Sequence, residues 1–174
     1  MCYSKDIFNE VNGFKHNSKI ASGDDVFLLE TIWRKYPEKV IYLKTKEAIV
    51  ETKSETSWVA FIQQQIRWAS KTSAYKNLFS KSVGLLIFSQ NALLIFSLFF
   101  LVFNHQHIRY FIVILMLKLF IDYFLIKKTA LFLNTKTQFV NYLSSSFLYP
   151  FFVVFIGCLS IFKNYKWKGR SFKS

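Results

Sequence analysis

The stretch WVAFIQQQIRWASK, from Trp58 to Lys71, contains neither glycine nor proline and has the apolar spacing of an amphipathic helix. At about 100° per residue its apolar and polar side chains fall on two separate arcs. The apolar arc consists of Trp58, Phe61, Ile62, Ile66 and Ala69, and the polar arc of Gln63, Gln64, Arg67 and Lys71, with Trp68 at the border. An edge that carries amides, a guanidinium and an indole can bind an anion and a flat ring together. A helix that lies on a membrane surface, with its cations meeting lipid head groups, has the same pattern.

A second polar motif, Ser22-Gly23-Asp24-Asp25, precedes the run VFLLETIWRKY. Ser22 suits a helix N-cap, and the pattern predicts a helix from Asp24 to Tyr36 that Pro37 ends. Its expected core residues are Phe27, Leu28, Ile32 and Trp33. The helix dipole favours two carboxylates in a first turn whatever their chemical role. The same position keeps an aspartate ionised, as a general base requires.

Both motifs belong to an ordered series that resembles the C-terminal half of membrane-bound family-2 glycosyltransferases. The series is Gly13-Phe14, Gly23-Asp24-Asp25, Gln64-Gln65-Ile66-Arg67-Trp68, apolar spans and Trp167-Lys168-Gly169-Arg170. The resemblance implies an inverting, nucleotide-sugar-dependent hexosyltransferase with a GT-A catalytic domain. It also implies that Asp25 is the catalytic base, and that Asp24, Gln64, Arg67 and Trp68 bind substrate.

The resemblance further implies a Mg²⁺ or Mn²⁺ ion held by a D-x-D motif, and no D-x-D occurs in the sequence. We therefore expect no metal ligand in this chain and no transferase activity from the chain alone. Met1-Cys2-Tyr3-Ser4 resembles a segment from the middle of a domain. We therefore expect the chain to be a fragment of a glycosyltransferase whose nucleotide-binding half lies upstream.

The expected fold class is an α/β partial GT-A domain followed by an α-helical transmembrane region. Residues 1–80 make the GT-A part, in which the β-branched runs Lys39 to Lys44 and Glu47 to Thr52 predict strands. Residues 81–163 hold two or three membrane spans, expected at 83–103, 110–126 and 139–162, and residues 164–174 form a basic tail. Pro150 allows the last span to bend back, so the number of full spans stays open.

The second expected span contains two ionisable residues, Lys118 and Asp122, four positions apart on one helical face. Ionisable groups in a bilayer are costly and tend to pair or to face a polar cavity. We favour a neutralised pair that fixes packing over a lining for a lipid-linked acceptor or product.

Composition narrows the class of protein. The 174 residues are 52% hydrophobic and include 21 Phe, which is too apolar for an ordinary soluble domain. The net charge of +13 is carried by Lys and Arg that largely flank apolar spans, so anionic lipids are the expected partners and nucleic acid is not. We expect a multi-pass protein of the bacterial inner membrane with its catalytic part on the cytoplasmic side.

The expected function is transfer of a sugar from a nucleotide-sugar donor to a lipid-linked or polysaccharide acceptor at the cytoplasmic membrane face. The alternative is a small, non-catalytic polytopic membrane protein with a basic lipid-surface or interaction module. Substitution of Asp25 separates the two, because only the enzyme requires a carboxylate there.

Overall fold

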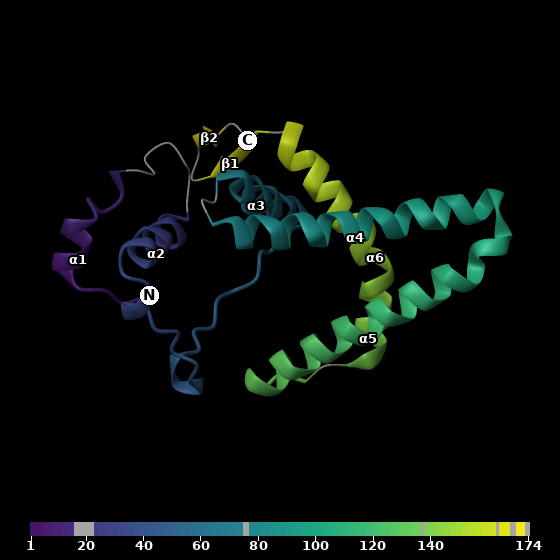
Figure 1. Ribbon diagram of the computed structural model, residues 1–174, viewed down its shortest axis with the longest axis horizontal. Helices are drawn as coiled ribbons and strands as arrows, with labels where there is room; N and C mark the ends of the chain where they lie inside the picture. Colours follow the sequence, from purple (N-terminus) through teal and green to yellow (C-terminus); the bar gives the residue numbers. More distant parts are fainter. Residues whose placement is uncertain (16–22, 75–76, 137, 163, 168–169, 173–174) are drawn as a thin grey trace. The chain divides into compact units, whose positions relative to one another are not determined.

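The computed structural model describes the chain except for residues 16–22, 75–76, 137, 163, 168–169 and 173–174 (Figure 1). The chain divides into two compact units, and each is described by itself. Unit 1 comprises Met1–Lys44, Ser54–Gly84 and Leu159–Ser174. Unit 2 comprises Thr45–Lys53 and Leu85–Cys158.

Unit 1 is built around two short helices. Helix α1, Lys5–Glu10, begins after Ser4, whose hydroxyl accepts a hydrogen bond of 3.3 Å from the N–H of Ile7. Helix α2, Asp24–Lys35, is followed by the 3₁₀ turn η2, Pro37–Lys39, as expected where proline stops a helix. A small core joins them, made of Val11, Leu28 and Ile32 with Ile7, Phe8 and Val40 packed against it.

The third helix of unit 1, α3, runs over Trp58–Ser70 and continues as the 3₁₀ turn η4, Lys71–Ala74. Ser57 caps its start by accepting a 3.2 Å hydrogen bond from the N–H of Ala60. Ile66 is buried, as its place on the apolar arc predicts. The helices predicted over 24–36 and 58–71 are therefore present almost to the residue.

The α/β fold class predicted above is wrong. Lys39 to Lys44 and Glu47 to Thr52 are not strands: the structure places the turn η3, Lys46–Ala48, between stretches without regular structure. A lone run cannot satisfy its backbone groups or bury its side chains, and Ile41, Tyr42 and Val50 are more than 80% exposed. Within the described residues the strands are β1, Tyr165–Trp167, and β2, Arg170–Phe172, which pair antiparallel as a two-stranded sheet.

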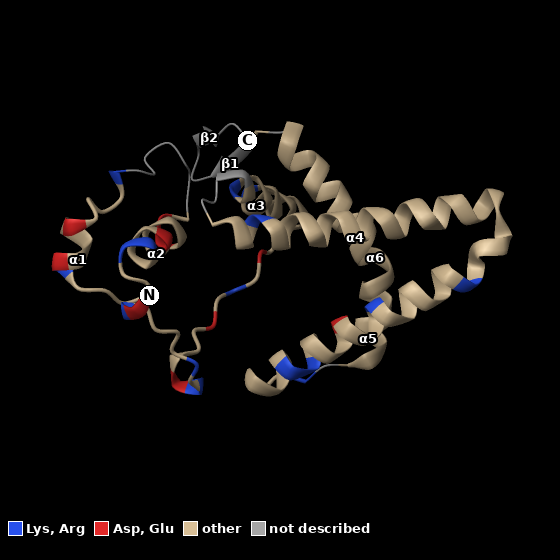
Figure 2. Cartoon of the chain, viewed as in Figure 1, with Lys and Arg blue, Asp and Glu red and all other residues tan. Residues whose placement is uncertain are grey.

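Two long helices are almost uniformly apolar. They are α4, Leu78–Phe103, and α6, Phe139–Phe162, which continues through Pro150. By length and composition, both are long and apolar enough to cross a membrane. Their ribbons are nearly free of the charged residues that mark α1 and α2 (Figure 2).

Helix α5, Ile108–Phe132, follows the 3₁₀ turn η5, His105–His107, and is as long as the other two. It differs from them in its five charged residues, which are Arg109, Lys118, Asp122, Lys127 and Lys128. Lys118 is buried and forms an ion pair with Asp122, as the spacing of four predicts. Its Nζ also lies 5.5 Å from the centre of the Tyr149 ring of α6.

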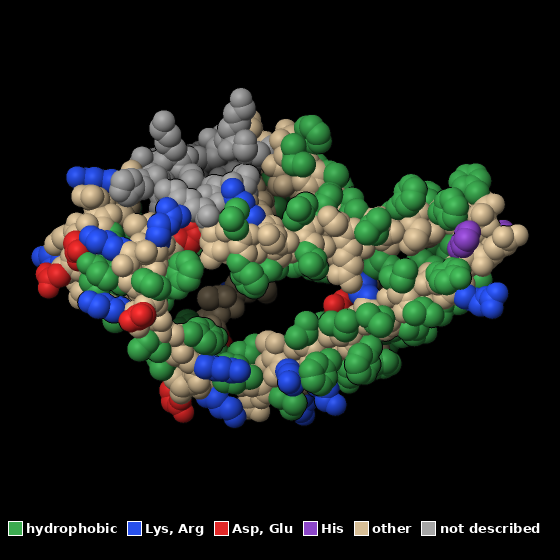
Figure 3. Space-filling model, in the orientation of Figure 1, with side chains coloured by type: hydrophobic (Ala, Val, Ile, Leu, Met, Phe, Trp, Pro, Cys, Tyr) green, Lys and Arg blue, Asp and Glu red, His purple; other side chains and the backbone are tan. Residues whose placement is uncertain are grey.

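Packing between the helices of unit 2 depends on a few close approaches. A Cβ atom added at Gly157 of α6 would lie 2.6 Å from the ring of Phe88 of α4, so only glycine fits there. The Tyr142 hydroxyl of α6 donates a 2.5 Å hydrogen bond to the carbonyl oxygen of Leu119 of α5. Most other apolar side chains lie on the surface, where they gather along the helices (Figure 3).

Candidate functional site

The acidic pair lies at the N-terminus of α2. Gly23 is the N-cap, with a φ of +89° that favours glycine, and its carbonyl oxygen accepts a 3.0 Å hydrogen bond from the N–H of Phe27. Ser22, the N-cap predicted from the sequence, lies outside the described residues. Asp24 and Asp25 occupy the first turn and are exposed. Their carboxylates are therefore accessible to a ligand.

Lys71, at the C-terminal end of α3, meets this turn. Its side chain lies so close to Gly23 that an added Cβ atom would be 3.2 Å from Nζ and 3.3 Å from Cδ. The residue is only 8% exposed. Glycine at position 23 thus both provides the left-handed cap of α2 and leaves room for the lysine.

The pKa of Lys71 is shifted by its burial and by the charged groups around it. Burial lowers this pKa below its ordinary value of 10.5, and the neighbouring Arg67 guanidinium lowers it further. Asp25 and Asp24 act in the opposite direction and raise it. The Lys71 ammonium therefore interacts with the arginine of α3 and with both carboxylates of α2, which lie 46 and 47 residues earlier in the sequence.

The remaining predicted site residues lie on α3 with different surroundings. Gln64 donates a 3.1 Å hydrogen bond from Nε2 to Oε1 of Glu55, in the segment before the helix. Trp68 is 52% exposed, so a face of its indole can stack on a ligand. The structure therefore groups Asp24, Asp25, Arg67 and Lys71, and it places Gln64 against Glu55.

Lys71 was assigned only to the polar arc in the sequence, without a role. The signal that could have singled it out is its spacing, because Gln64, Arg67 and Lys71 follow one another at i, i+3 and i+7 along one edge of the helix. Sequence spacing shows a shared edge, but it does not show that this edge faces the start of α2.

A divalent cation does not fit the described residues of this site. Mg²⁺ and Mn²⁺ take several oxygen ligands, whereas the site offers two adjacent carboxylates beside a buried ammonium and a guanidinium. Among the residues that the structure describes, no group of three or more His, Cys, Asp or Glu side chains could hold a metal ion. We therefore derive no step through a metal.

Comparisons of the chain with models of known protein families, with curated proteins and with solved structures found no match.

Proposed function

We propose that the chain takes part in inverting transfer of a sugar from a nucleotide-sugar to a lipid-linked or polysaccharide acceptor at the cytoplasmic face of the bacterial inner membrane. The observation that supports this proposal most is the meeting of two motifs at Lys71. An exposed pair of carboxylates and a guanidinium lie around the same ammonium. Inverting sugar transfer can use both groups, because a base takes the proton of the acceptor and a cation stabilises the charge on the departing diphosphate.

In the proposed reaction Asp25 accepts the proton of an acceptor hydroxyl as that oxygen attacks the anomeric carbon of the donor. The bond between the anomeric carbon and the diphosphate oxygen breaks, and the configuration at carbon inverts. Arg67 stabilises the negative charge on the departing diphosphate, because its guanidinium presents a planar set of donors that matches phosphate oxygens. Asp24 binds the sugar hydroxyls, and Trp68 offers a stacking face to the acceptor.

The membrane location is supported by α4 and α6, which are long and apolar enough to cross a bilayer. A lipid-linked acceptor has its reactive head at the membrane surface, so a charged site on a chain that also carries such helices suits this substrate class. The basic composition, with a net charge of +13, favours contact with anionic lipid on the cytoplasmic side.

The test is sugar transfer by membranes from bacteria that express the gene together with its native upstream sequence. Each membrane sample receives one radiolabelled nucleotide-sugar, and label is counted in extracted lipid and in polymer. Asp25→Asn should lower transfer about 100-fold or more, because it removes a general base without changing the size of the side chain. The 174-residue chain by itself should transfer no sugar, since its sequence has no D-x-D motif.

Asp6→Asn is the matched control, because Asp6 is an exposed carboxylate in the first turn of α1. It should leave transfer unchanged. Equal transfer by the wild type and by Asp25→Asn would refute the catalytic assignment of Asp25.

Arg67→Lys tests whether transfer depends on the planar donors of the guanidinium or only on its positive charge, because lysine keeps the charge and lacks the planar set of donors. We expect about a tenfold loss of transfer, the equivalent of one charge-assisted hydrogen bond. Arg34→Lys on the exposed face of α2 is the control and should have no effect.

A second candidate function is a non-catalytic lipid-surface module. It is favoured by α3, an amphipathic helix on which Trp58 and Val59 are more than 70% exposed. The sugar-transfer assay separates the two candidates. A lipid-surface module transfers no sugar, as the wild type or as any variant, and its binding to anionic vesicles is the same in the wild type and in Asp25→Asn.

A further inference from the structure

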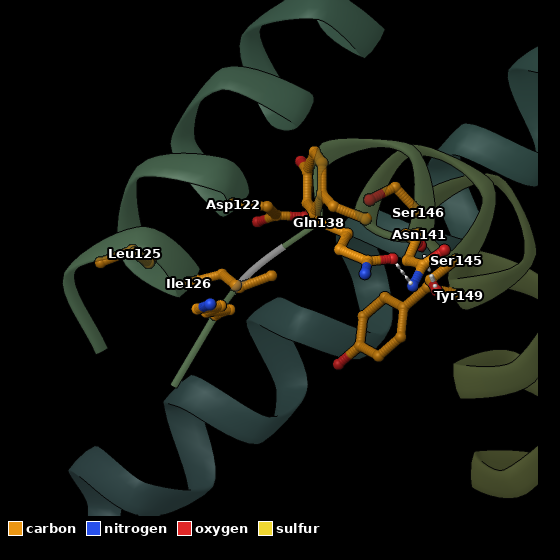
Figure 4. A pocket seen from close by; sticks show the side chains of 10 residues that line it. Asp122, Leu125, Ile126, Gln138, Asn141, Ser145, Ser146 and Tyr149 are labelled. Atoms are coloured by element: carbon orange, nitrogen blue, oxygen red, sulfur yellow. Dashed lines mark hydrogen bonds between the residues drawn. The ribbon is translucent and has the colours of Figure 1, made fainter. Parts of the chain in front are cut away.

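Unit 2 contains a cavity of about 710 Å³ between the C-terminal half of α5 and the N-terminal half of α6. Figure 4 shows polar side chains from both helices around it. Its lining includes Asp122 of α5 and the polar or aromatic residues Lys136, Gln138, Asn141, Ser145 and Tyr149. The volume lies within the range of about 300–1,000 Å³ that is typical of small-molecule sites.

The lining has the chemistry of a site for hydroxyl groups. Asn141 donates a 2.8 Å hydrogen bond from Nδ2 to Oε1 of Gln138, which holds both amides in place and leaves the N–H groups of Gln138 for a ligand (Figure 4). Ser145 donates its hydroxyl hydrogen to the carbonyl oxygen of Asn141, so its oxygen can accept. Tyr149 adds an aromatic ring, against which the apolar face of a sugar can stack.

The cavity selects a head group through its hydrogen-bonding groups and not through its charges. Asp122 contributes a carboxylate, which accepts hydrogen bonds from hydroxyls. The same carboxylate forms an ion pair with the buried Lys118. Lys136 is the one cation among the described lining residues, so the lining carries one charge of each sign.

A second cavity, of about 140 Å³, shares Ser146 with the first. Except for Ser146, its lining is apolar and consists of Leu94, Ile95, Leu98, Phe111, Leu115, Phe147, Pro150 and Phe151. Pro150 has no N–H group, so the carbonyl oxygen of Ser146 receives no helical hydrogen bond from residue 150. The two cavities thus share one lining residue, Ser146, whose carbonyl oxygen lacks its usual helical hydrogen bond.

We propose that unit 2 binds an amphiphile with a sugar-type head group, whose hydroxyls occupy the larger cavity and whose apolar chain enters the smaller one. The amides, the carboxylate and the tyrosine ring recognise the head, and the meeting of the two cavities at Ser146 selects a lipid over a free sugar. The inference goes beyond the proposed transfer reaction, because it concerns binding and uses no residue of unit 1.

The test measures binding to the full chain in phosphatidylcholine nanodiscs by native mass spectrometry. The probes are monoglucosyldiacylglycerol, phosphatidylglycerol and free glucose. The glucolipid should be retained at least about tenfold more strongly than either of the others, since a few good hydrogen bonds suffice for that ratio. No nucleotide-sugar is present in this experiment. A lack of glucolipid binding would therefore not bear on the transferase proposal, which the sugar-transfer assay tests separately.

Gln138→Leu removes the amide whose N–H groups face the ligand, and we expect it to weaken glucolipid binding about fivefold. Gln90→Leu is the matched control, because Gln90 is an exposed residue of α4 that lines neither cavity. Asn141→Leu provides a second variant of the same site in case Gln138→Leu fails to fold, which far-UV circular dichroism shows.

The proposal is supported if the chain binds the glucolipid selectively, if Gln138→Leu or Asn141→Leu weakens this binding, and if Gln90→Leu leaves it unchanged. Stronger binding of phosphatidylglycerol overturns the sugar-type head group, and equal binding of free glucose overturns the role of the apolar cavity. Equal retention of all lipids, or an equal effect of all three variants, overturns the site itself.

Discussion

The two units differ in how they bury apolar side chains. In unit 1 a small core, with Leu28 only 1% exposed, forms between α1 and α2, while Ile41 and Tyr42 are more than 80% exposed. In unit 2 most Leu, Ile and Phe side chains of α4, α5 and α6 point outward. Each unit also buries a lysine, Lys71 in unit 1 and Lys118 in unit 2.

This difference indicates which surroundings each unit suits. A helix with one apolar stripe, such as α2, places that stripe against protein and the rest against water. A helix that is apolar all around, such as α4, needs apolar surroundings on every side, and a bilayer provides them. The buried charge in unit 2 and the buried leucine in unit 1 are therefore the places at which each unit is most sensitive to substitution.

The largest effect is expected at the ion pair of unit 2. Asp122→Asn leaves the Lys118 ammonium, whose side chain is 3% exposed, without its counter-charge. The free energy of unfolding should fall by roughly 3–5 kcal/mol, measured by far-UV circular dichroism in mixed micelles with increasing dodecyl sulfate. The double variant Lys118→Met/Asp122→Leu should recover most of this loss, and a double variant as unstable as Asp122→Asn would contradict this explanation.

A smaller loss is expected in the core of unit 1. Leu28→Ala should reduce the stability of this unit by roughly 2–5 kcal/mol, because it opens a cavity between α1 and α2. Hydrogen exchange followed by mass spectrometry should show faster exchange in α2 and unchanged exchange in α5. The neighbouring Leu29 is 39% exposed, so Leu29→Ala is the control and should leave the exchange of α2 nearly as it is.

The smallest effect is expected at the surface of unit 1, where Glu10 accepts hydrogen bonds from Lys35, at 2.7 Å, and from the hydroxyl of Tyr36. The bond from Lys35, followed by that from Tyr36, holds the pKa of Glu10 below its ordinary value of 4.5. Because the folded pKa is the lower one, this contribution to stability is present above about pH 4.5 and is lost as the pH falls through the folded pKa.

Glu10→Gln should remove that part of the pH dependence, which thermal unfolding followed by tryptophan fluorescence can detect. The change is small because exposed ion pairs contribute little. Glu38→Gln, at an exposed position of the turn η2, is the control. If both variants keep the wild-type pH dependence, Glu10 is not its source.

The helices were predictable from the sequence because their hydrogen bonds and apolar spacing are local. Patterns of three and four residues predicted α2 and α3, and Phe27, Leu28 and Ile32 are buried as expected. Trp33 was predicted to be buried as well, and it is 50% exposed, because the stripe that contacts α1 is narrower than the apolar arc of α2. The prediction of strands was wrong because a strand forms only beside a partner strand, and a local sequence pattern does not show whether that partner exists.

The candidate site was predictable in its parts and not in its assembly. The sequence singled out Asp24, Asp25 and Arg67 through motif chemistry, and it assigned no role to Lys71. The contact between Lys71 and Gly23 depends on the left-handed cap at Gly23 and on a Lys71 side chain that follows α3 and reaches this cap. The roles of Asp25, Gln64, Arg67 and Trp68 in sugar transfer remain predictions, and Gln64 has a partner in Glu55 that its motif did not suggest.

The start of α2 and the end of α3 are interpreted above as one site around Lys71. The pKa of Lys71 tests this interpretation, and NMR titration of the ¹³Cε signal in the full chain in micelles measures it, with Lys71→Arg to assign the signal. We expect a pKa below 10.5, and a still lower pKa in Asp24→Asn/Asp25→Asn, because both carboxylates raise it. If the pKa has its ordinary value and does not respond to the loss of the two carboxylates, the two helix ends do not form one site.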